Sequence, residues 1–263
     1  MTGDGKSLDR DGWRFQLAPA TGCRAAELVE RALAAASGKA GRLLRRSRNA
    51  SSFRSTTGSG QVSAEVFIKV IEPPHGIDRL KAILRGSRAA HVARITEKLN
   101  TAGFAAPPVL LFGREEATGR ELLLTPVVND DGPFRALEGT PAQKRAMLRA
   151  LGTELARLHR AGFIHGDLTP YNLFIARAPR FTFIDHERTR RTFPIGRRRR
   201  QLRNLVQLGR FDLPSLSRTD RMRVLRAYGA DLDRAAWRSL RRRVAAMLQR
   251  RIKRDGLEPA RRA

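Results

Sequence analysis

A polar loop between two short apolar segments constrains this chain more than any other feature of its sequence. Residues 162–172 begin with an apolar pair and read His-x-Asp-x-x-x-x-Asn from His165 onward. Residues 181–184 form a second, mostly apolar run, and Asp185 follows it directly. Because each polar residue stands at the edge of a buried strand, we expect the fold to hold it in a fixed position.

The spacing of these residues is typical of enzymes that transfer phosphate from ATP to a hydroxyl group. In that chemistry Asp167 orients and deprotonates the attacking hydroxyl, while His165 supports the backbone of the loop. Asn172 and Asp185 offer an amide oxygen and a carboxylate to Mg²⁺, a hard cation that prefers oxygen ligands. Each of these residues is ordinary in a turn or a cap, but the whole set at this spacing predicts an ATP- and Mg²⁺-dependent kinase.

Three antiparallel strands are predicted upstream, at 41–46, 52–57 and 62–71. Lys69 lies late in the third strand, where kinases place the lysine that contacts the α- and β-phosphates of ATP. The turn before the second strand carries Ser51 and Ser52, whose hydroxyls and backbone N–H groups are predicted to bind those phosphates. This turn lacks the glycine pattern of protein kinases, so a purely structural hairpin is the simpler alternative.

Two helices are predicted after these strands, at 77–85 and 87–103. A kinase uses the second helix to supply a glutamate to the strand lysine. Here the expected face carries Val92, and Glu97 lies well round the helix from the apolar stripe. The sequence therefore offers no clear glutamate partner for Lys69.

A further hairpin is predicted at 109–113 and 121–128, and its second strand gives way to turn residues. We expect a hinge at this point, where a kinase would bind adenine through backbone hydrogen bonds. Pro126 has no N–H to donate, so Val127 and Val128 are the predicted ATP-binding residues of the hinge.

The clearest helix in the sequence is predicted at 140–161, with Thr140 as N-cap and Pro141 at its first position, and it leads directly into the polar loop. Further helices are predicted at 198–209, 218–228 and 232–253. These elements predict an α+β, bilobal, protein-kinase-like fold with a small antiparallel-sheet N-lobe and a mainly helical C-lobe. The predicted domains are an N-terminal extension at 1–40 with a short strand and helix, an N-lobe at 41–129, and a C-lobe at 130–263 with basic C-terminal helices.

The chain is strongly basic, with 52 Lys and Arg residues against 25 Asp and Glu residues and a net charge of +27. Such a field attracts polyanions, among them anionic lipid and phosphorylated glycolipid. Almost all of the basic residues are arginines, which a GC-rich genome would also produce. The run at 197–200 and the basic face of the last predicted helix favour an anionic glycolipid or sugar as acceptor and contact with an anionic membrane surface, with no specific nucleic acid expected.

Cysteine content and hydropathy bear on the compartment. Cys23 is the only cysteine, so no internal disulfide can form, which fits a reducing compartment. No apolar run approaches the ~20 residues that a membrane-spanning helix needs, and we recognise no signal segment at the N-terminus. We therefore predict a cytoplasmic protein that is able to bind peripherally to the inner membrane.

Several segments together resemble the lipopolysaccharide kinase family, bacterial enzymes similar to protein kinases that phosphorylate heptose or Kdo sugars of the lipid A–core. The resemblance covers roughly residues 40–230 and implies Asp167 as base, Asn172 and Asp185 as magnesium ligands, and Lys69 as phosphate contact. Aminoglycoside and choline kinases share the motif of the polar loop. The segments that carry the resemblance are Lys69 in its strand, the helix start at 86–89, residues 103–107, residues 158–162, and the motif from His165 to Asn172 with Asp185.

The resemblance and the charge together predict an ATP-dependent kinase of a sugar hydroxyl on the lipopolysaccharide core, acting at the cytoplasmic face of the membrane. Two alternatives stay open. One is a soluble small-molecule kinase of the aminoglycoside-phosphotransferase type, whose usually cationic substrates fit poorly with a net charge of +27. The other is a catalytically weak pseudokinase or basic scaffold, which the missing helix glutamate and the glycine-poor turn suggest.

Overall fold

A computed structural model describes most of the chain. The described residues are 6–18, 21, 24–39, 41–58, 63–73, 86–129, 139–175, 180–193, 195–210 and 216–255. The predicted helix at 77–85 and Cys23 lie outside these ranges. The chain divides into two compact units, a sheet unit of residues 1–101 and 106–128 and a helical unit of residues 102–105 and 129–263.

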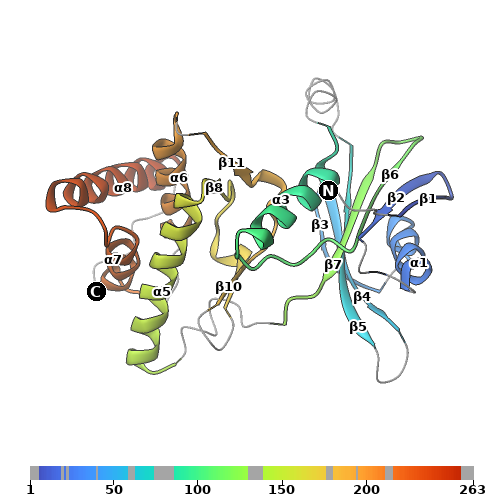
Figure 1. Ribbon diagram of the computed structural model, residues 1–263, viewed down its shortest axis with the longest axis horizontal. Helices are drawn as coiled ribbons and strands as arrows, with labels where there is room; N and C mark the ends of the chain where they lie inside the picture. The colour runs from blue at the N-terminus through green and yellow to red at the C-terminus, as the bar shows by residue number, and fades with distance from the viewer. Residues whose placement is uncertain are drawn as a thin grey trace. The chain divides into compact units, whose positions relative to one another are not determined.

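The sheet unit contains an antiparallel, seven-stranded sheet with the order β1-β2-β6-β7-β5-β4-β3 (Figure 1). The predicted strands are present within a few residues of their expected bounds, and β1 is an additional strand that pairs with β2. Because β2 pairs in turn with β6, the N-terminal segment is a full part of this sheet. The strands are β1 (Ser7–Arg10), β2 (Trp13–Leu17), β3 (Arg42–Arg46), β4 (Ala50–Thr57), β5 (Ala64–Ile71), β6 (Leu111–Glu115) and β7 (Glu121–Pro126).

Two helices cover opposite faces of this sheet. Successive residues of a strand point to opposite faces, so the same strands contribute side chains to both helix contacts. Helix α1 (Ala25–Ala36) buries an apolar stripe against the face that carries Val66, Ile68 and Val70. Helix α3 (Arg88–Thr101) packs Ala89 and Val92 on the other face, against Ile71 and Leu123. Burial on both faces explains why the central strands β5 and β7 are apolar along most of their length.

The start of α3 is fixed to strand β7 by a buried carboxylate. Glu121, which is 9% exposed, accepts hydrogen bonds from the backbone N–H of Ala89 at 2.7 Å and from the hydroxyl of Ser87 at 3.0 Å. The Ser87 hydroxyl also accepts from the N–H of Ala90 at 3.1 Å, as an N-cap residue does. A carboxylate at a helix N-terminus also interacts favourably with the helix dipole. Helix α3 is therefore held to the sheet through polar bonds as well as packing.

The helical unit is built around α5 (Pro141–Arg160), which begins with a full capping box between Thr140 and Gln143. Helix α5 packs on α7, and the two backbones approach so closely at Gly152 that no side chain fits there. The other elements are the strands β8 (Phe163–Ile164), β9 (Leu173–Ile175), β10 (Phe181–Phe183) and β11 (Arg190–Arg191), the 3₁₀ turns η3 (Pro170–Asn172) and η4 (His186–Arg188), and the helices α6 (Arg197–Gly209), α7 (Arg218–Tyr228) and α8 (Arg234–Asp255).

The predicted fold class is confirmed: one unit is an antiparallel sheet with helices on its faces, and the other is mainly helical. Two short antiparallel pairs, β9 with β10 and β8 with β11, lie beside the helices of the second unit and carry the polar loop between them. None of the helices in the described ranges combines the length and the apolar character that a membrane span requires.

Candidate active site

The polar loop between β8 and β9 is closed by hydrogen bonds to one carbonyl group. The carbonyl oxygen of Asp167 accepts from the N–H of Thr169 at 2.9 Å and from the side-chain amide of Asn172 at 2.9 Å. A carbonyl oxygen can accept a hydrogen bond but cannot donate one, so the NH₂ group of the Asn172 amide must be the part that faces it. The amide oxygen of Asn172 is then the atom that can serve as a metal ligand. The carboxylate of Asp167 takes no part in closing the loop.

Only glycine fits between His165 and Asp167. Gly166 has a left-handed backbone with φ of 77°, and a Cβ atom there would lie 2.7 Å from the Cβ of Arg188. Glycine adopts this conformation without the steric cost that other residues pay. The segment after Asp185 therefore packs directly on the backbone of the polar loop.

Asp185 follows β10 with an exposed side chain and a left-handed backbone, φ 61° and ψ 62°. This conformation costs a non-glycine residue roughly 1–3 kcal/mol, so its surroundings must enforce it. On the preceding side, the N–H of Ile184 donates to the carbonyl of Asn172 at 3.1 Å. On the following side, His186 hydrogen-bonds the carbonyl of Phe183 at 2.9 Å. The structure thus brings the segments of Asn172 and Asp185 together, as the spacing in the sequence predicts.

The oxygen atoms of the Asn172 and Asp185 side chains suit Mg²⁺ that is bound together with a nucleotide. No group of three His, Cys, Asp or Glu side chains that could hold a metal ion occurs within the described part of the chain. Mg²⁺ typically uses one or two carboxylates, several waters and the phosphates of its substrate, and it needs no full protein cage. The exposed carboxylate of Asp185 and the amide oxygen of Asn172 fit that ligand set.

His165 connects the loop of Asp167 to the segment of Asp185. Its ring is buried, and Nε2 lies 2.9 Å from the carbonyl oxygen of Ile184, to which it must donate. Burial lowers the pKa of His165, so the ring is neutral and carries its proton on Nε2. The carbonyl of His165 in turn accepts a hydrogen bond from the hydroxyl of Thr189 at 2.9 Å.

Helix α6 binds the backbone of the polar loop through two amide side chains, Asn204 and Gln207, whose role was not predicted from the sequence. The side-chain oxygen of Asn204 accepts from the N–H of His165 at 3.1 Å, and Asn204 donates to the side chain of Gln207 at 3.0 Å. Gln207 donates to the carbonyl of Gly166 at 3.1 Å. The backbone N–H of His165 and the backbone carbonyl of Gly166 are therefore both bound to one helix. The available signal was a polar Asn among the apolar residues of the predicted helix at 198–209.

The same asparagine also binds a buried histidine of α5. His159 places Nε2 3.2 Å from the side-chain oxygen of Asn204 and Nδ1 2.9 Å from the hydroxyl of Tyr228. Burial lowers the pKa of His159 to about 4 and raises the pKa of Tyr228 to about 12. The network is therefore neutral at pH 7: Nε2–H donates to Asn204, and the tyrosine hydroxyl donates to Nδ1.

Acidification is expected to destabilise the protein through His159. A buried histidine with a folded pKa of about 4 and an ordinary pKa of 6.5 stabilises the native state fully above pH 6.5, and this contribution is lost as the pH falls toward 4. The difference corresponds to about 3 kcal/mol of unfolding free energy. Urea unfolding at pH 7 and at pH 4.5 measures it. His159→Gln should weaken this pH dependence, whereas the partly exposed His91→Gln on α3 should keep it; equal behaviour of both variants would contradict the assignment.

Lys69, Ser51 and Ser52, the predicted phosphate contacts, lie in paired strands. Lys69 of β5 is half-buried on the face that α3 covers, opposite Ser52 of β4 and Leu123 of β7. Ser52 therefore shares a face with Lys69. Ser51 pairs with Val70 and belongs to the opposite face.

The turn between β3 and β4 is shorter than predicted. The N–H of Ser47 donates to the carbonyl of Ala50 at 2.8 Å, and its hydroxyl accepts from the N–H of Ala50 at 3.1 Å, so β4 already begins at Ala50. The backbones of Ser51 and Ser52 pair with β3 and β5. The expectation that their N–H groups cradle phosphate is therefore corrected, because ladder bonds already use these groups; only their hydroxyls can contribute.

The hinge prediction narrows to one residue. The N–H of Val127 donates to the carbonyl of Glu65 at 3.0 Å, which continues the pairing of β7 with β5. It cannot donate to adenine at the same time, so Val128 is the remaining predicted donor. On α3, Glu97 is exposed and Val92 is buried against the sheet, as the helical periodicity predicts. The bonds of Glu121 to the start of that helix are not predictable from the sequence, in which Glu121 is the first residue of a predicted strand.

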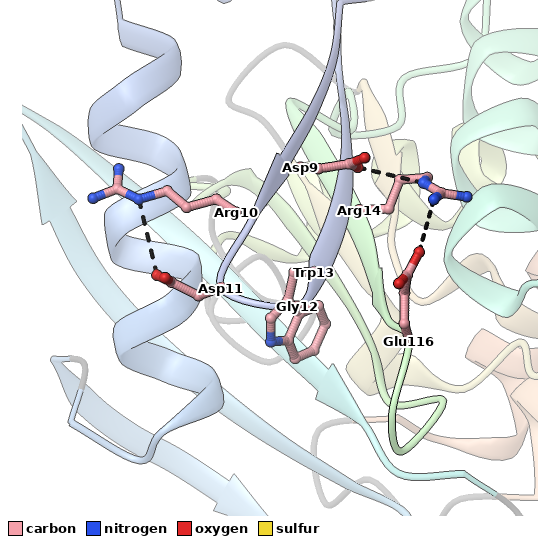
Figure 2. A pocket seen from close by; sticks show the side chains of 7 residues that line it. All are labelled: Asp9, Arg10, Asp11, Gly12, Trp13, Arg14 and Glu116. Carbon is pink, nitrogen blue, oxygen red and sulfur yellow. Dashed lines mark hydrogen bonds and ion pairs between the residues drawn. The ribbon is translucent and has the colours of Figure 1, made fainter.

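A separate depression of about 320 Å³ lies at the turn between β1 and β2 (Figure 2). Arg14 bridges Asp9 at 3.3 Å and Glu116 at 2.7 Å there. None of the predicted site residues lines it. Its lining residues are Asp9, Arg10, Asp11, Gly12, Trp13, Arg14 and Glu116.

Comparison with known proteins adds two curated relatives. The KEOPS complex subunit Bud32 of Pyrococcus abyssi is 29% identical over 116 residues, which are 44% of this chain and 50% of that protein. The probable serine/threonine-protein kinase BUD32 homolog of Archaeoglobus fulgidus is 31% identical over 109 residues, which are 41% of this chain and 49% of that protein. The chain thus spans about half the length of the curated relatives it matches. The name of the second relative is that of a probable kinase, the class of enzyme that the sequence of this chain predicts.

The family comparison confirms the resemblance found in the sequence. The model of the lipopolysaccharide kinase (Kdo/WaaP) family matches residues 78–228, a narrower range than the one expected from the sequence. The match contains the whole polar loop, Asp185 and Asn204, and it begins after Lys69. On this match over more than half of its length, the chain belongs to the lipopolysaccharide kinase (Kdo/WaaP) family.

Proposed function

We propose that this protein is an ATP- and Mg²⁺-dependent kinase that phosphorylates a sugar hydroxyl of the lipopolysaccharide core, Kdo or heptose, at the cytoplasmic face of the membrane. The observation that carries the proposal is the junction of the polar loop with the segment of Asp185. Ile184 binds Asn172 through its N–H and His165 through its carbonyl. A candidate base and two candidate metal ligands are thereby held on one rigid framework, as phosphoryl transfer requires.

Each residue of this framework has a distinct task in the proposed reaction. The carboxylate of Asp167 accepts the proton of the sugar hydroxyl as the hydroxyl oxygen attacks the γ-phosphorus of ATP, while the bond from this phosphorus to the β,γ-bridging oxygen breaks and ADP leaves. The amide oxygen of Asn172 and the carboxylate of Asp185 would hold Mg²⁺, which neutralises charge on the β- and γ-phosphates when it is bound. Lys69 keeps its predicted role as a contact of the α- and β-phosphates, and Val128 its role as the hinge donor.

Charge next to the polar loop supports an anionic acceptor. Arg188, Arg190 and Arg191 lie within six residues after Asp185, and their side chains are exposed. Strand β11, which carries two of them, pairs with β8 immediately before His165. Kdo is a sugar acid and the core carries phosphate, so such arginines would attract this acceptor. An aminoglycoside acceptor, which is cationic, would be repelled.

Deleting the gene from its host and weighing the lipopolysaccharide by mass spectrometry tests the proposal. We expect the core to lose one phosphate, and a plasmid copy of the gene should restore it. A copy with Asp167→Asn should fail to restore the phosphate although the protein is present at the same level. An unchanged core mass in the deletion strain would overturn the proposed substrate.

A further inference from the structure

Two large apolar side chains stand in solvent between β11 and α6. Phe193 is 84% exposed and Ile195 is 92% exposed. No other large apolar side chain in the described ranges is as exposed; the next value is 60%, for Tyr171. Exposed apolar residues are common singly, but two neighbours at this exposure indicate a surface that meets a partner.

Thr192 and Arg197, which lie before Phe193 and after Ile195, bind backbone carbonyls at the C-terminal end of α5. Thr192 is buried and donates to the carbonyl of Gly162 from its N–H at 2.9 Å. The guanidinium of Arg197 donates to the carbonyls of His159 and Arg160, the latter at 2.6 Å. The bond to Arg160 serves a carbonyl of the last helical turn, which has no partner within the helix. Thr192 before Phe193 and Arg197 after Ile195 are therefore both attached at the end of α5.

Arginines flank the two apolar side chains on both sides. No Asp or Glu occurs between Arg188 and Arg210, so this stretch of the chain has only positive charge. The exposed arginines next to Phe193 and Ile195 are Arg190 and Arg191 before them and Arg198, Arg199 and Arg200 after them. We call these seven residues the apolar–basic patch.

We propose that the apolar–basic patch is a membrane contact, in which Phe193 and Ile195 enter the interface of an anionic bilayer and the flanking arginines bind its phosphate headgroups. Apolar side chains that enter the acyl boundary, with basic residues at the headgroups, are the two components of interfacial binding. A second copy of the chain is a poor occupant, because the like charges of two such patches repel. Nucleic acid fits less well, because only Phe193 of the two apolar side chains has an aromatic ring that can stack on a base.

The patch is joined to the candidate active site within the helical unit. Arg190 and Arg191 pair with Ile164 and Phe163, the two residues directly before His165. Thr189 binds the carbonyl of His165. A membrane bound at the patch would therefore lie at a fixed distance from Asp167. This consequence rests on the proposed function, whereas the membrane contact itself does not.

Binding of the full-length protein to vesicles, without nucleotide, tests the contact. Sedimentation with phosphatidylglycerol-containing vesicles should show binding, and pure phosphatidylcholine vesicles should show much weaker binding. Phe193→Ser with Ile195→Ser should lower affinity for the anionic vesicles by at least about tenfold. Arg198→Gln with Arg199→Gln and Arg200→Gln should lower it by roughly 100-fold. These side chains are exposed, so thermal unfolding of the variants should match that of the unaltered protein.

Matched controls separate this contact from general charge attraction. Leu43→Ser with Leu44→Ser alters another exposed apolar pair that arginines flank, on β3. Arg241→Gln with Arg242→Gln and Arg243→Gln removes the same charge from α8, whose basic face the sequence also predicts to meet a membrane, and therefore compares that surface with the apolar–basic patch. Both controls should keep at least half of the binding affinity, and equal losses in controls and patch variants would overturn the proposal. If the unaltered protein forms a dimer in gel filtration and the patch variants lose it while their vesicle binding is unchanged, the patch contacts a second copy of the chain. That result would also overturn the proposal.

Insertion has its own readout. Phe193→Trp should shift tryptophan emission to shorter wavelength on anionic vesicles, and brominated acyl chains should quench it. Emission that stays unchanged on bound vesicles would overturn the proposed insertion. A protein that binds and inserts but leaves the lipopolysaccharide core unphosphorylated would keep the membrane contact and lose the proposed function, so the two failures are distinguishable.

Discussion

Asp167→Asn is expected to lower the rate of phosphoryl transfer by roughly 10²–10⁴-fold while Mg-ATP binding is retained. The loop is closed through the main-chain carbonyl of Asp167, which accepts from Thr169 and Asn172. Replacing its carboxylate with an amide therefore removes the proton acceptor and leaves these bonds in place. The rate is measured as phosphate transferred to purified lipopolysaccharide core, and binding as the rise in melting temperature with Mg-ATP.

A matched charge change controls for surface electrostatics in this experiment. Asp231 lies in the same unit, its side chain is 79% exposed, and it pairs with Arg160 at 2.5 Å. Asp231→Asn removes the same charge and should leave the rate within about twofold, since exposed ion pairs contribute little. Turnover that survives in Asp167→Asn would contradict its role as base. A parallel loss of Mg-ATP binding would show that the substitution disturbs more than proton transfer.

Asn204→Ala is expected to destabilise the protein by about 3 kcal/mol or more, because it leaves buried donors without partners. The N–H of His165 and the Nε2–H of His159 both lose their acceptor. In the fraction that folds, we expect the rate constant of phosphate transfer to fall while the KM for ATP stays nearly constant, since Asn204 positions the loop and does not touch the substrate. Urea unfolding and steady-state kinetics measure the two effects.

A conservative substitution separates positioning from simple loss of stability. Asn204→Asp keeps an oxygen for His165 and His159, so it should restore much of the rate that alanine loses. The new carboxylate should also raise the pKa of His159, so the loss of stability between pH 6.5 and 4 should shrink. Gln207→Ala, which removes the bond to Gly166 at 3.1 Å, should change the rate and the stability less than the two substitutions of Asn204 do. If Asn204→Asp did not restore the rate and did not change the pH dependence of stability, the positioning role of Asn204 would be wrong.

The polar loop could be predicted from the sequence because its geometry is local. Asn172 binds the carbonyl of a residue five positions before it, and that distance is written directly in the spacing of the motif. The strand before Asp185 was also predictable, because a buried pair of short strands leaves an apolar signature. Helix α5 was predictable for the same reason, since its N-cap, its first proline and its apolar stripe lie in one stretch.

Residues that act across the fold gave no such signal. Asn204 lies 39 positions after His165, and Glu121 lies 32 positions after Ala89, so only the packed structure shows that they are partners. Ser51 and Ser52 belong to opposite faces of the sheet, and which of them shares a face with Lys69 depends on the register of β4. A shift of one residue in this register exchanges the two faces. Strand β1 was missed because its residues are polar and mostly exposed, so they show no alternation.

The bond between Glu121 and α3 also bears on control of the enzyme. Protein kinases are often switched by displacing the corresponding helix from the sheet. Here displacement would strip a buried carboxylate of its partners, the N–H of Ala89 and the hydroxyl of Ser87, at a cost of roughly 1–3 kcal/mol for each bond. We therefore expect helix α3 and strand β7 to move together, since separating them would require this cost.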